Sequence, residues 1–209
     1  MSLIELSHRI VEGMITYPGI PAPVMGVHLS REASRDLYAE GTEFFIGTIT
    51  MAANTGTYLD SPHHRFADGA DLSGLPLEKL ADLDGVVVKG VDLPGDLDVA
   101  GKAVLFHTGW DTHWGTDAYF SGHPHLTAET SAALVAGGAV LVGIDSFNID
   151  ATPPKGDRPA HTTLLGAGIP IVEHLTNLGS LPASGFRFHA APPLVAGMGT
   201  FPVRAYAVV

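Results

Sequence analysis

Three mostly apolar runs that are rich in β-branched residues constrain the fold of this 209-residue chain more than any other feature. They lie at residues 85–91, 103–108 and 139–145, and glycines bound them. Continuous runs of this kind are typical of strands that are buried on both faces of a sheet. Further strands are expected at residues 3–6, 24–30, 43–53, 169–173, 186–191 and 203–209.

Helices are expected to be few. The clearest one covers residues 128–136, between a threonine cap and a Gly-Gly pair. One or two helical turns are expected over residues 75–80, and a short helix is expected to begin at His161. Many strands with two or three helices predict a mixed α/β fold with layered sheets, in a single domain that spans residues 1–209.

Two predictions concern residues 30–53, which precede the most polar motif. Residues 30–41 are polar and are expected to form a loop or a short helix that covers a site. In the following strand, residues 43–53, Thr and Ile alternate with Gly and Phe, which is a half-buried pattern. Phe44 and Phe45 are accordingly expected to pack in the core.

The charge of the chain excludes two classes of partner. The formal net charge is −11, with 22 acidic against 11 basic residues. Nucleic acid and anionic membrane surfaces both attract a basic face, which this composition does not favour. Neither nucleic acid nor a membrane is therefore expected as a partner.

The chain contains no cysteine and 11 histidines. Any metal ion would therefore bind to nitrogen and oxygen ligands, among which imidazole is abundant. We see no signal peptide at the N-terminus and no run of ~18 apolar residues that could span a bilayer. A cytoplasmic protein is expected.

Residues 53–64 hold the densest set of reactive side chains, namely Asn54, Tyr58, Asp60 and the adjacent histidines at 63 and 64. A strand that ends in Gly, Asp, Pro and His commonly holds such groups at the rim of a rigid sheet. Taken alone, the pattern favours a simpler interpretation, in which Asp60 makes a turn and the histidines lie on the surface.

Other expected strands end in comparable residues. Asp145 follows the strand at 139–145, and Glu173 closes the strand at 169–173. The loop at 111–125 is long for a compact domain and is rich in aromatic residues and histidine, as functional loops often are.

Together these residues resemble the cyclase family, the metal-dependent hydrolases that include bacterial kynurenine formamidase and isatin hydrolase. The family signature reads His-x-Gly-Thr-His-x-Asp-x-Pro-x-His. Residues 54–64 keep its glycine, threonine, aspartate, proline and last histidine, while Asn54 and Tyr58 replace its first two histidines. The likeness runs along nearly the whole chain, including residues 108–110, 143–150 and 199–204.

The resemblance implies a swivelling β/β/α domain that assembles into dimers or larger homo-oligomers. It also implies that Asp60, His161 and Glu173 are metal ligands and that His64 is the acid/base beside the attacking water. A single Zn²⁺ or Mn²⁺ would suit such ligands. It would supply hydroxide near neutral pH for opening an amide, lactam or lactone.

The two replaced histidines leave three interpretations open. In the first, one metal remains on Asp60, His161 and Glu173, with or without His64. In the second no metal binds, and Tyr58, Asp60, His64 and Glu173 perform acid/base chemistry such as cyclisation or dehydration. In the third the protein binds a small ligand without turnover.

Several further residues are candidates for contacts with an aromatic or polyketide-like substrate. Asn54 stands at a lost ligand position, and Trp110 and Phe66 offer aromatic surfaces. Trp114, in the long loop, is a comparable candidate. Asp145 is expected either to orient His161 or to hold a loop.

Overall fold

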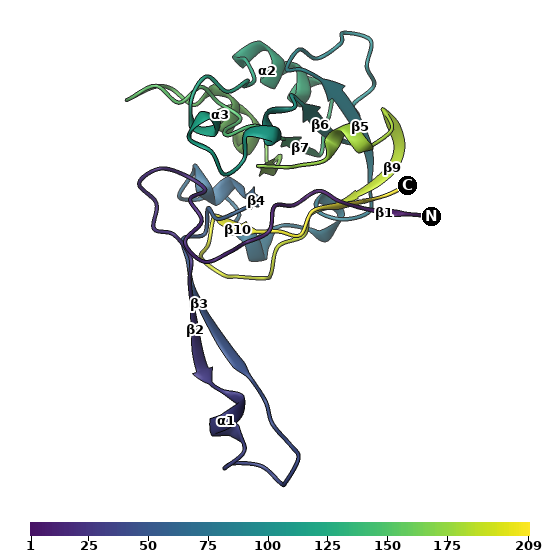
Figure 1. The fold of residues 1–209 in the computed structure, drawn as a ribbon. Helices are drawn as coiled ribbons and strands as arrows, with labels where there is room; N and C mark the ends of the chain where they lie inside the picture. The colour runs from purple at the N-terminus through teal and green to yellow at the C-terminus, as the bar shows by residue number, and fades with distance from the viewer.

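The computed structural model describes residues 1–209, and a curled nine-stranded sheet forms its body (Figure 1). From one edge to the other, the strands are β1 (Leu3–Glu5), β11 (Tyr206–Val208), β9 (Ser184–His189), β5 (Leu83–Lys89), β6 (Ala103–His107), β7 (Leu141–Ile144), β8 (Ile171–Glu173), β4 (Tyr58–Asp60) and β10 (Thr200–Pro202). Strands β5 to β8 run parallel, and the other neighbours are antiparallel. The expectation of a mixed α/β fold is confirmed.

The central strands are buried on both faces, as their apolar runs predict. In β6, Val104 and Phe106 belong to one hydrophobic core, while Ala103 and Leu105 belong to the other. Helices α2 (Ala128–Ala136) and α3 (Pro159–Gly166) supply leucines to the first core. Segments from both ends of the chain complete the second core.

The helices predicted from the sequence are present in the structure, but some of their boundaries differ. α2 has the expected bounds, whereas α3 begins at Pro159, two residues before His161. The turns expected over residues 75–80 form a 3₁₀ helix at Leu77–Lys79, after another at Leu72–Gly74. Three more 3₁₀ segments lie at Trp110–His113, Asp117–Phe120 and Leu178–Ser180. No helix combines the length and apolar character that a transmembrane span requires.

A two-stranded arm stands away from the body (Figure 1). It consists of β2 (Val24–Leu29) and β3 (Ile46–Thr50), with α1 (Arg31–Ser34) near its tip. Three expectations are wrong here. All of β3 is exposed, and Phe44 and Phe45 are 52% and 50% exposed. The expected short helix does form as α1, but it lies near the tip of the arm and away from the body of its own chain. The reason is that the arm leaves the core of its own chain, which an alternating pattern does not reveal.

Candidate active site

The register of the sheet brings the reactive motif next to Glu173. β4 pairs with β8 so that Tyr58 lies opposite Glu173, and β10 pairs with β4 so that Thr200 lies opposite Asp60. Tyr58 and Asp60 are two residues apart on one strand and therefore point to the same face. A 3₁₀ helix at Pro62–His64 then returns His64 toward this face.

Asp60 is fully buried, and only one of its two carboxylate oxygens accepts a hydrogen bond. Oδ1 accepts a hydrogen bond of 2.5 Å from the Thr200 hydroxyl, which lies 2.9 Å from Nδ1 of His64. Since the hydroxyl gives its only proton to the carboxylate, it accepts from His64. In this arrangement Nδ1 of His64 donates to Thr200, and Nε2 makes no hydrogen bond to the protein.

His161 reaches the same place from α3 and is held by Asp150. Nδ1 of His161 lies 2.7 Å from Asp150 Oδ2, which also accepts the His161 backbone amide at 3.0 Å. Asp150 Oδ1 accepts the amide of Ala160 at 2.7 Å. A carboxylate only accepts, so Nδ1 donates and Nε2 is turned toward Asp60 at 3.6 Å and Glu173 at 3.8 Å.

Asp60, His64 and His161 are arranged as the ligands of a metal ion would be. Asp60, His64 and His161 each offer one ligand atom, and these atoms lie within 4.8 Å of one another. Asp60 Oδ2 is buried and accepts no hydrogen bond, and 3.6 Å is too long for one with His161. A divalent cation among one carboxylate and two imidazoles would satisfy this oxygen, and these donors suit Zn²⁺ or Mn²⁺.

When no metal ion is bound, a proton on His161 can balance the negative charge of Asp60. Burial acts to lower the pKa of His161, but the hydrogen bond to Asp150 and the charges of Asp60 and Glu173 outweigh it and raise this pKa to about 10. Burial acts to raise the pKa of Asp60, but His161 and His64 bring it below its ordinary value. A protonated His161 thus neutralises Asp60 without a metal, and metal binding would release that proton.

Glu173 lies beside the three-residue group rather than in it. Its Oε2 accepts from the Tyr58 hydroxyl at 2.6 Å and from Asn148 Nδ2 at 3.4 Å, while Oε1 accepts the Ile149 amide at 2.7 Å. Burial, partly opposed by the positive charge of His161, raises the pKa of Glu173 to about 7. The carboxylate is therefore committed to three donors of the protein.

Tyr58 and Asn54 occupy the positions of the two missing histidines. Burial, followed by the charges of Glu173 and Asp60, raises the pKa of Tyr58 well above its ordinary value. The phenol therefore stays neutral and donates to Glu173, which is a different role from that of a metal-binding imidazole. Asn54 lies beside it at the pocket.

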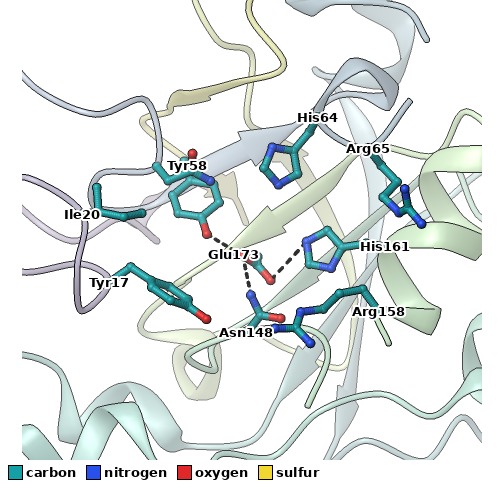
Figure 2. Close-up of a pocket in the computed structure, with 10 residues that line it drawn as sticks. Tyr17, Ile20, Tyr58, His64, Arg65, Asn148, Arg158, His161 and Glu173 are labelled. Carbon is teal, nitrogen blue, oxygen red and sulfur yellow. Dashed lines mark hydrogen bonds and ion pairs between the residues drawn. The ribbon is translucent and has the colours of Figure 1, made fainter. Parts of the chain in front are cut away.

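A pocket of about 280 Å³ opens over these groups (Figure 2). It therefore has room for a small molecule only. Its lining residues are Tyr17, Ile20, Asn54, Tyr58, His64, Arg65, Asn148, Arg158, His161 and Glu173.

Two of the predicted substrate contacts lie elsewhere. The indole of Trp110 donates to the Tyr119 carbonyl at 3.0 Å, and Phe66 packs against the core on the helix side. Neither residue lines the pocket, and Trp114 instead stacks on His8 at 4.0 Å. The aromatic contribution to the pocket comes from Tyr17 and Tyr58.

Of the two roles open to Asp145, the structure supports holding a loop. Its carboxylate accepts from the amide and hydroxyl of Thr108, at 2.7 and 2.6 Å, and from the Gly109 amide at 2.9 Å. Asp150 is the residue that orients His161. Sequence reasoning missed this role of Asp150 and the contacts of Thr200, Asn148, Arg65 and Arg158, although Arg65 directly follows His64 and Arg158 shortly precedes His161.

Close backbone contact between two loops holds His64 in place. The Ser61 amide donates to the Gly199 carbonyl at 2.7 Å. A Cβ atom on Gly199 would lie 2.6 Å from the backbone nitrogen of His64, so no larger residue fits without movement of the loop. This explains a glycine directly before Thr200.

Sequence comparison relates the chain to one family. Residues 4–151 match the family described as "Putative cyclase". The chain is 30% identical over 217 residues to the kynurenine formamidase of Salinibacter ruber, covering 98% of this chain and 96% of that protein. The kynurenine formamidase of Bacillus cereus is 27% identical over 216 residues, covering 97% and 95%.

Solved structures show the same fold. An isatin hydrolase bound to the product analogue thioisatinate superimposes with a TM-score of 0.79 at 21% identity, covering 99% of this chain and 92% of that one. Isatin hydrolase A from Labrenzia aggregata, bound to benzyl benzoate, gives 0.79 at 23% identity and covers 100% and 93%. A potential metal-dependent hydrolase with cyclase activity gives 0.75 at 23% identity and covers 99% and 96%.

Proposed function

Since this chain belongs to the cyclase family, we propose that it is a metal-dependent hydrolase that opens a small amide, lactam or lactone. The observation that carries the proposal is the group of Asp60, His64 and His161, in which a buried carboxylate oxygen lacks a partner beside a small pocket. Similarity to kynurenine formamidases along the whole chain supports hydrolysis of a C–N bond in particular.

A bound Zn²⁺ or Mn²⁺ would supply an activated water at neutral pH and would polarise the substrate carbonyl. We assign the ligands to Asp60, His161 and His64. Oε1 of Glu173 lies 3.8 Å from Nε2 of His161, the same atom that faces Asp60, so Glu173 is the alternative third ligand. Asp150 holds His161 in the tautomer that presents Nε2. Tyr58 and Asn148 hold Glu173, and Asn54 contacts the substrate from the pocket wall.

His64 is the best placed group for proton transfer. It lines the pocket, its side chain is 35% exposed, and Thr200 fixes its ring through Nδ1. In the alternative in which Glu173 is the third ligand, Nε2 of His64 is free to take a proton from the attacking water and return it to the leaving nitrogen or oxygen.

The direct test is turnover. We expect protein loaded with Zn²⁺ or Mn²⁺ to hydrolyse at least one of N-formylkynurenine, isatin and simple lactones, and to lose this activity when a chelator removes the ion. Product formation followed by chromatography measures both. Hydrolysis that continues undiminished in stripped protein would contradict the assigned metal role.

A second candidate function is favoured by one observation. A neutral phenol and a buried carboxylate, Tyr58 and Glu173, share a hydrogen bond of 2.6 Å at the pocket. Such a pair could exchange a proton with an enolisable substrate, as a metal-independent cyclase or dehydratase requires. Proton exchange at an enolisable substrate in the presence of chelator would support it, whereas thermal shifts without any product would support a silent binder.

We also propose that residues 1–209 form one domain of the swivelling β/β/α type. The pairing of β1 with β11, which joins the two ends of the chain in one sheet, supports a single domain. The superposition on isatin hydrolases supports the fold type. A cytoplasmic location remains a prediction.

The exposed arm supports a homo-oligomer, and we propose that it packs against a second copy of the chain. A hairpin of two strands is marginally stable in isolation, and this one has no core of its own to cover. Several apolar side chains of the arm are exposed, and exposed apolar patches commonly mark surfaces that bind another protein. Among them are Val24, Val27, Leu37, Phe44, Phe45 and Ile49.

Substituting the arm is expected to dissociate the oligomer. We expect a Phe44→Ser, Ile49→Ser double variant to lower the mass in solution to that of one chain, because both side chains are about half exposed in the single chain. Light scattering coupled to gel filtration measures the mass. The matched control is Leu194→Ser on the body, which removes a side chain that is 81% exposed. A wild-type protein that is monomeric at micromolar concentration would contradict the proposal.

A further inference from the structure

The arginines of this chain fall into two groups. Seven occur in the sequence, and four form ion pairs with carboxylates: Arg31 and Arg35 with Glu43, Arg187 with Asp82 and Asp84, and Arg204 with Glu5. The other three, Arg9, Arg65 and Arg158, pair with no carboxylate. Acidic residues outnumber basic ones by 22 to 11, so unpaired guanidinium groups are unexpected. Two of the three line the active-site pocket.

We propose that Arg65 and Arg158 bind a carboxylate of the substrate, so that the enzyme acts on small amides, lactams or lactones that carry a carboxylic acid. This inference rests on the proposed hydrolase and names its substrate class. Figure 2 shows both side chains near His161, on the same side of the pocket. The positive charges thus lie beside the group that would handle the scissile carbonyl.

Thr162 and Phe66 hold the Arg65 guanidinium in place, while its two Nη groups make no hydrogen bond to the protein. Its Nε donates to the Thr162 hydroxyl at 3.2 Å, and its guanidinium carbon lies 5.3 Å from the centre of the Phe66 ring. Stacking on an aromatic face is a favourable position for a guanidinium. Both Nη groups remain without a protein acceptor, so they are available to a ligand.

Arg158 is fixed by the loop that precedes α3. Its Nη1 donates to the backbone carbonyls of Ala151, Gly156 and Asp157, at 3.0, 3.3 and 3.1 Å. These bonds hold the planar group in one orientation, while Nε and Nη2 make no hydrogen bond to the protein. A pre-oriented guanidinium is well suited to a planar carboxylate, which it can bind through two parallel hydrogen bonds.

A carboxylate fits this pocket better than a more highly charged anion. The buried carboxylates of Asp60 and Glu173 lie in the same site, and the whole chain carries a charge of −11. A phosphate dianion would meet stronger repulsion than a single carboxylate. The pocket of about 280 Å³ has room for a small acyl compound, with the carboxylate at the arginines and the carbonyl near Asp60.

The test uses two pairs of ligands that differ only in this charge: N-formylanthranilate and N-formyl-L-phenylalanine, each against its carboxamide. Calorimetric titration of metal-stripped protein is expected to show that at least one carboxylate binds roughly tenfold tighter than its carboxamide, as charge-assisted hydrogen bonds would give. Arg65→Gln and Arg158→Gln are each expected to reduce this preference several-fold. The matched control is Arg9→Gln, which removes an unpaired arginine outside the pocket and should leave the preference unchanged.

The outcomes separate this inference from the hydrolase proposal. Equal affinity within both pairs, no binding of either carboxylate, or a preference that survives Arg65→Gln would overturn the inference even if the protein hydrolyses isatin or a neutral lactone. Selective binding of the carboxylates without turnover of any substrate would keep the inference and overturn the hydrolase. Arg65 is exposed and touches no loop carbonyl, so this variant is informative even if Arg158→Gln destabilises its loop.

Discussion

Replacing Asp60 with alanine is expected to remove both the metal ion and hydrolysis, because this residue connects the other members of the site. Its Oδ1 accepts from Thr200, whose hydroxyl positions His64, and its Oδ2 is turned toward His161. The substitution therefore removes one ligand and releases the ring of a second. Neither neighbouring strand supplies a replacement carboxylate at this position, since Ile171 and Thr200 lie opposite Asp60.

Elemental analysis of protein purified without a histidine tag measures the first effect. We expect about one Zn or Mn per wild-type chain and a content at least tenfold lower in Asp60→Ala, with a fall in kcat/KM of at least roughly 100-fold. Asp68→Ala is the matched control, because Asp68 is exposed and makes no hydrogen bond or ion pair through its side chain. Metal that stays at full occupancy in Asp60→Ala would place the ion elsewhere.

An Asp60→Asn variant separates charge from geometry. The amide oxygen can still accept from Thr200 and keep His64 in place, while the buried negative charge is lost. If charge on Asp60 holds the ion, this variant should lose metal nearly as fully as Asp60→Ala. If it retains metal, His64 and His161 contribute more of the affinity than the carboxylate does.

The sheet could be predicted from sequence because its signal is local. Residues 103–106 and 139–144 contain no polar side chain, which is typical of strands that are covered on both faces of a sheet. The order of the strands could not be read in the same way. β4 and β10 pair at Asp60 and Thr200, which are 140 positions apart in the sequence, and neither segment carries a local signal that identifies its partner.

The prediction that Phe44, Phe45 and the following strand are buried is wrong because a sequence pattern is local, whereas burial depends on distant contacts. Phe44, Phe45 and β3 carry the apolar content of a buried strand, and periodicity reports that a side chain prefers to leave water. It does not report whether the covering surface belongs to the same chain. A prediction made for one chain therefore assigns such residues to its own core, even where they project from it.

The candidate site was predicted in outline through the family signature. Asp60, Tyr58, His64, His161 and Glu173 do lie together around one pocket or cluster. The supporting contacts were not accessible, since each depends on tertiary distances. Asp145 and Asp150 both follow the strand β7, and only the structure shows that the second one reaches His161.

Replacing Asp150 with asparagine is expected to impair the site by reversing the proton of His161. Asp150 accepts both the ring Nδ1–H and the backbone amide of His161. If the asparagine NH₂ group faces the ring, Nδ1 can only accept, and the proton moves to Nε2. That proton would then point at Asp60 and block the lone pair that a metal requires. We expect metal affinity to fall by about 10- to 100-fold, as losses of such supporting carboxylates do.

The matched control is Asp145→Asn, because Asp145 is an equally buried carboxylate that holds the loop at Thr108 and Gly109 without touching the metal group. Both variants lose hydrogen bonds to backbone amides, so both are expected to unfold more easily, by about 1–3 kcal/mol. Only Asp150→Asn should lower metal affinity and shift the ¹⁵N NMR signals of His161 to the other tautomer. Equal loss of affinity in the two variants would mean that Asp150 acts through general stability, whereas a selective loss would identify it as the residue that positions His161 for metal binding.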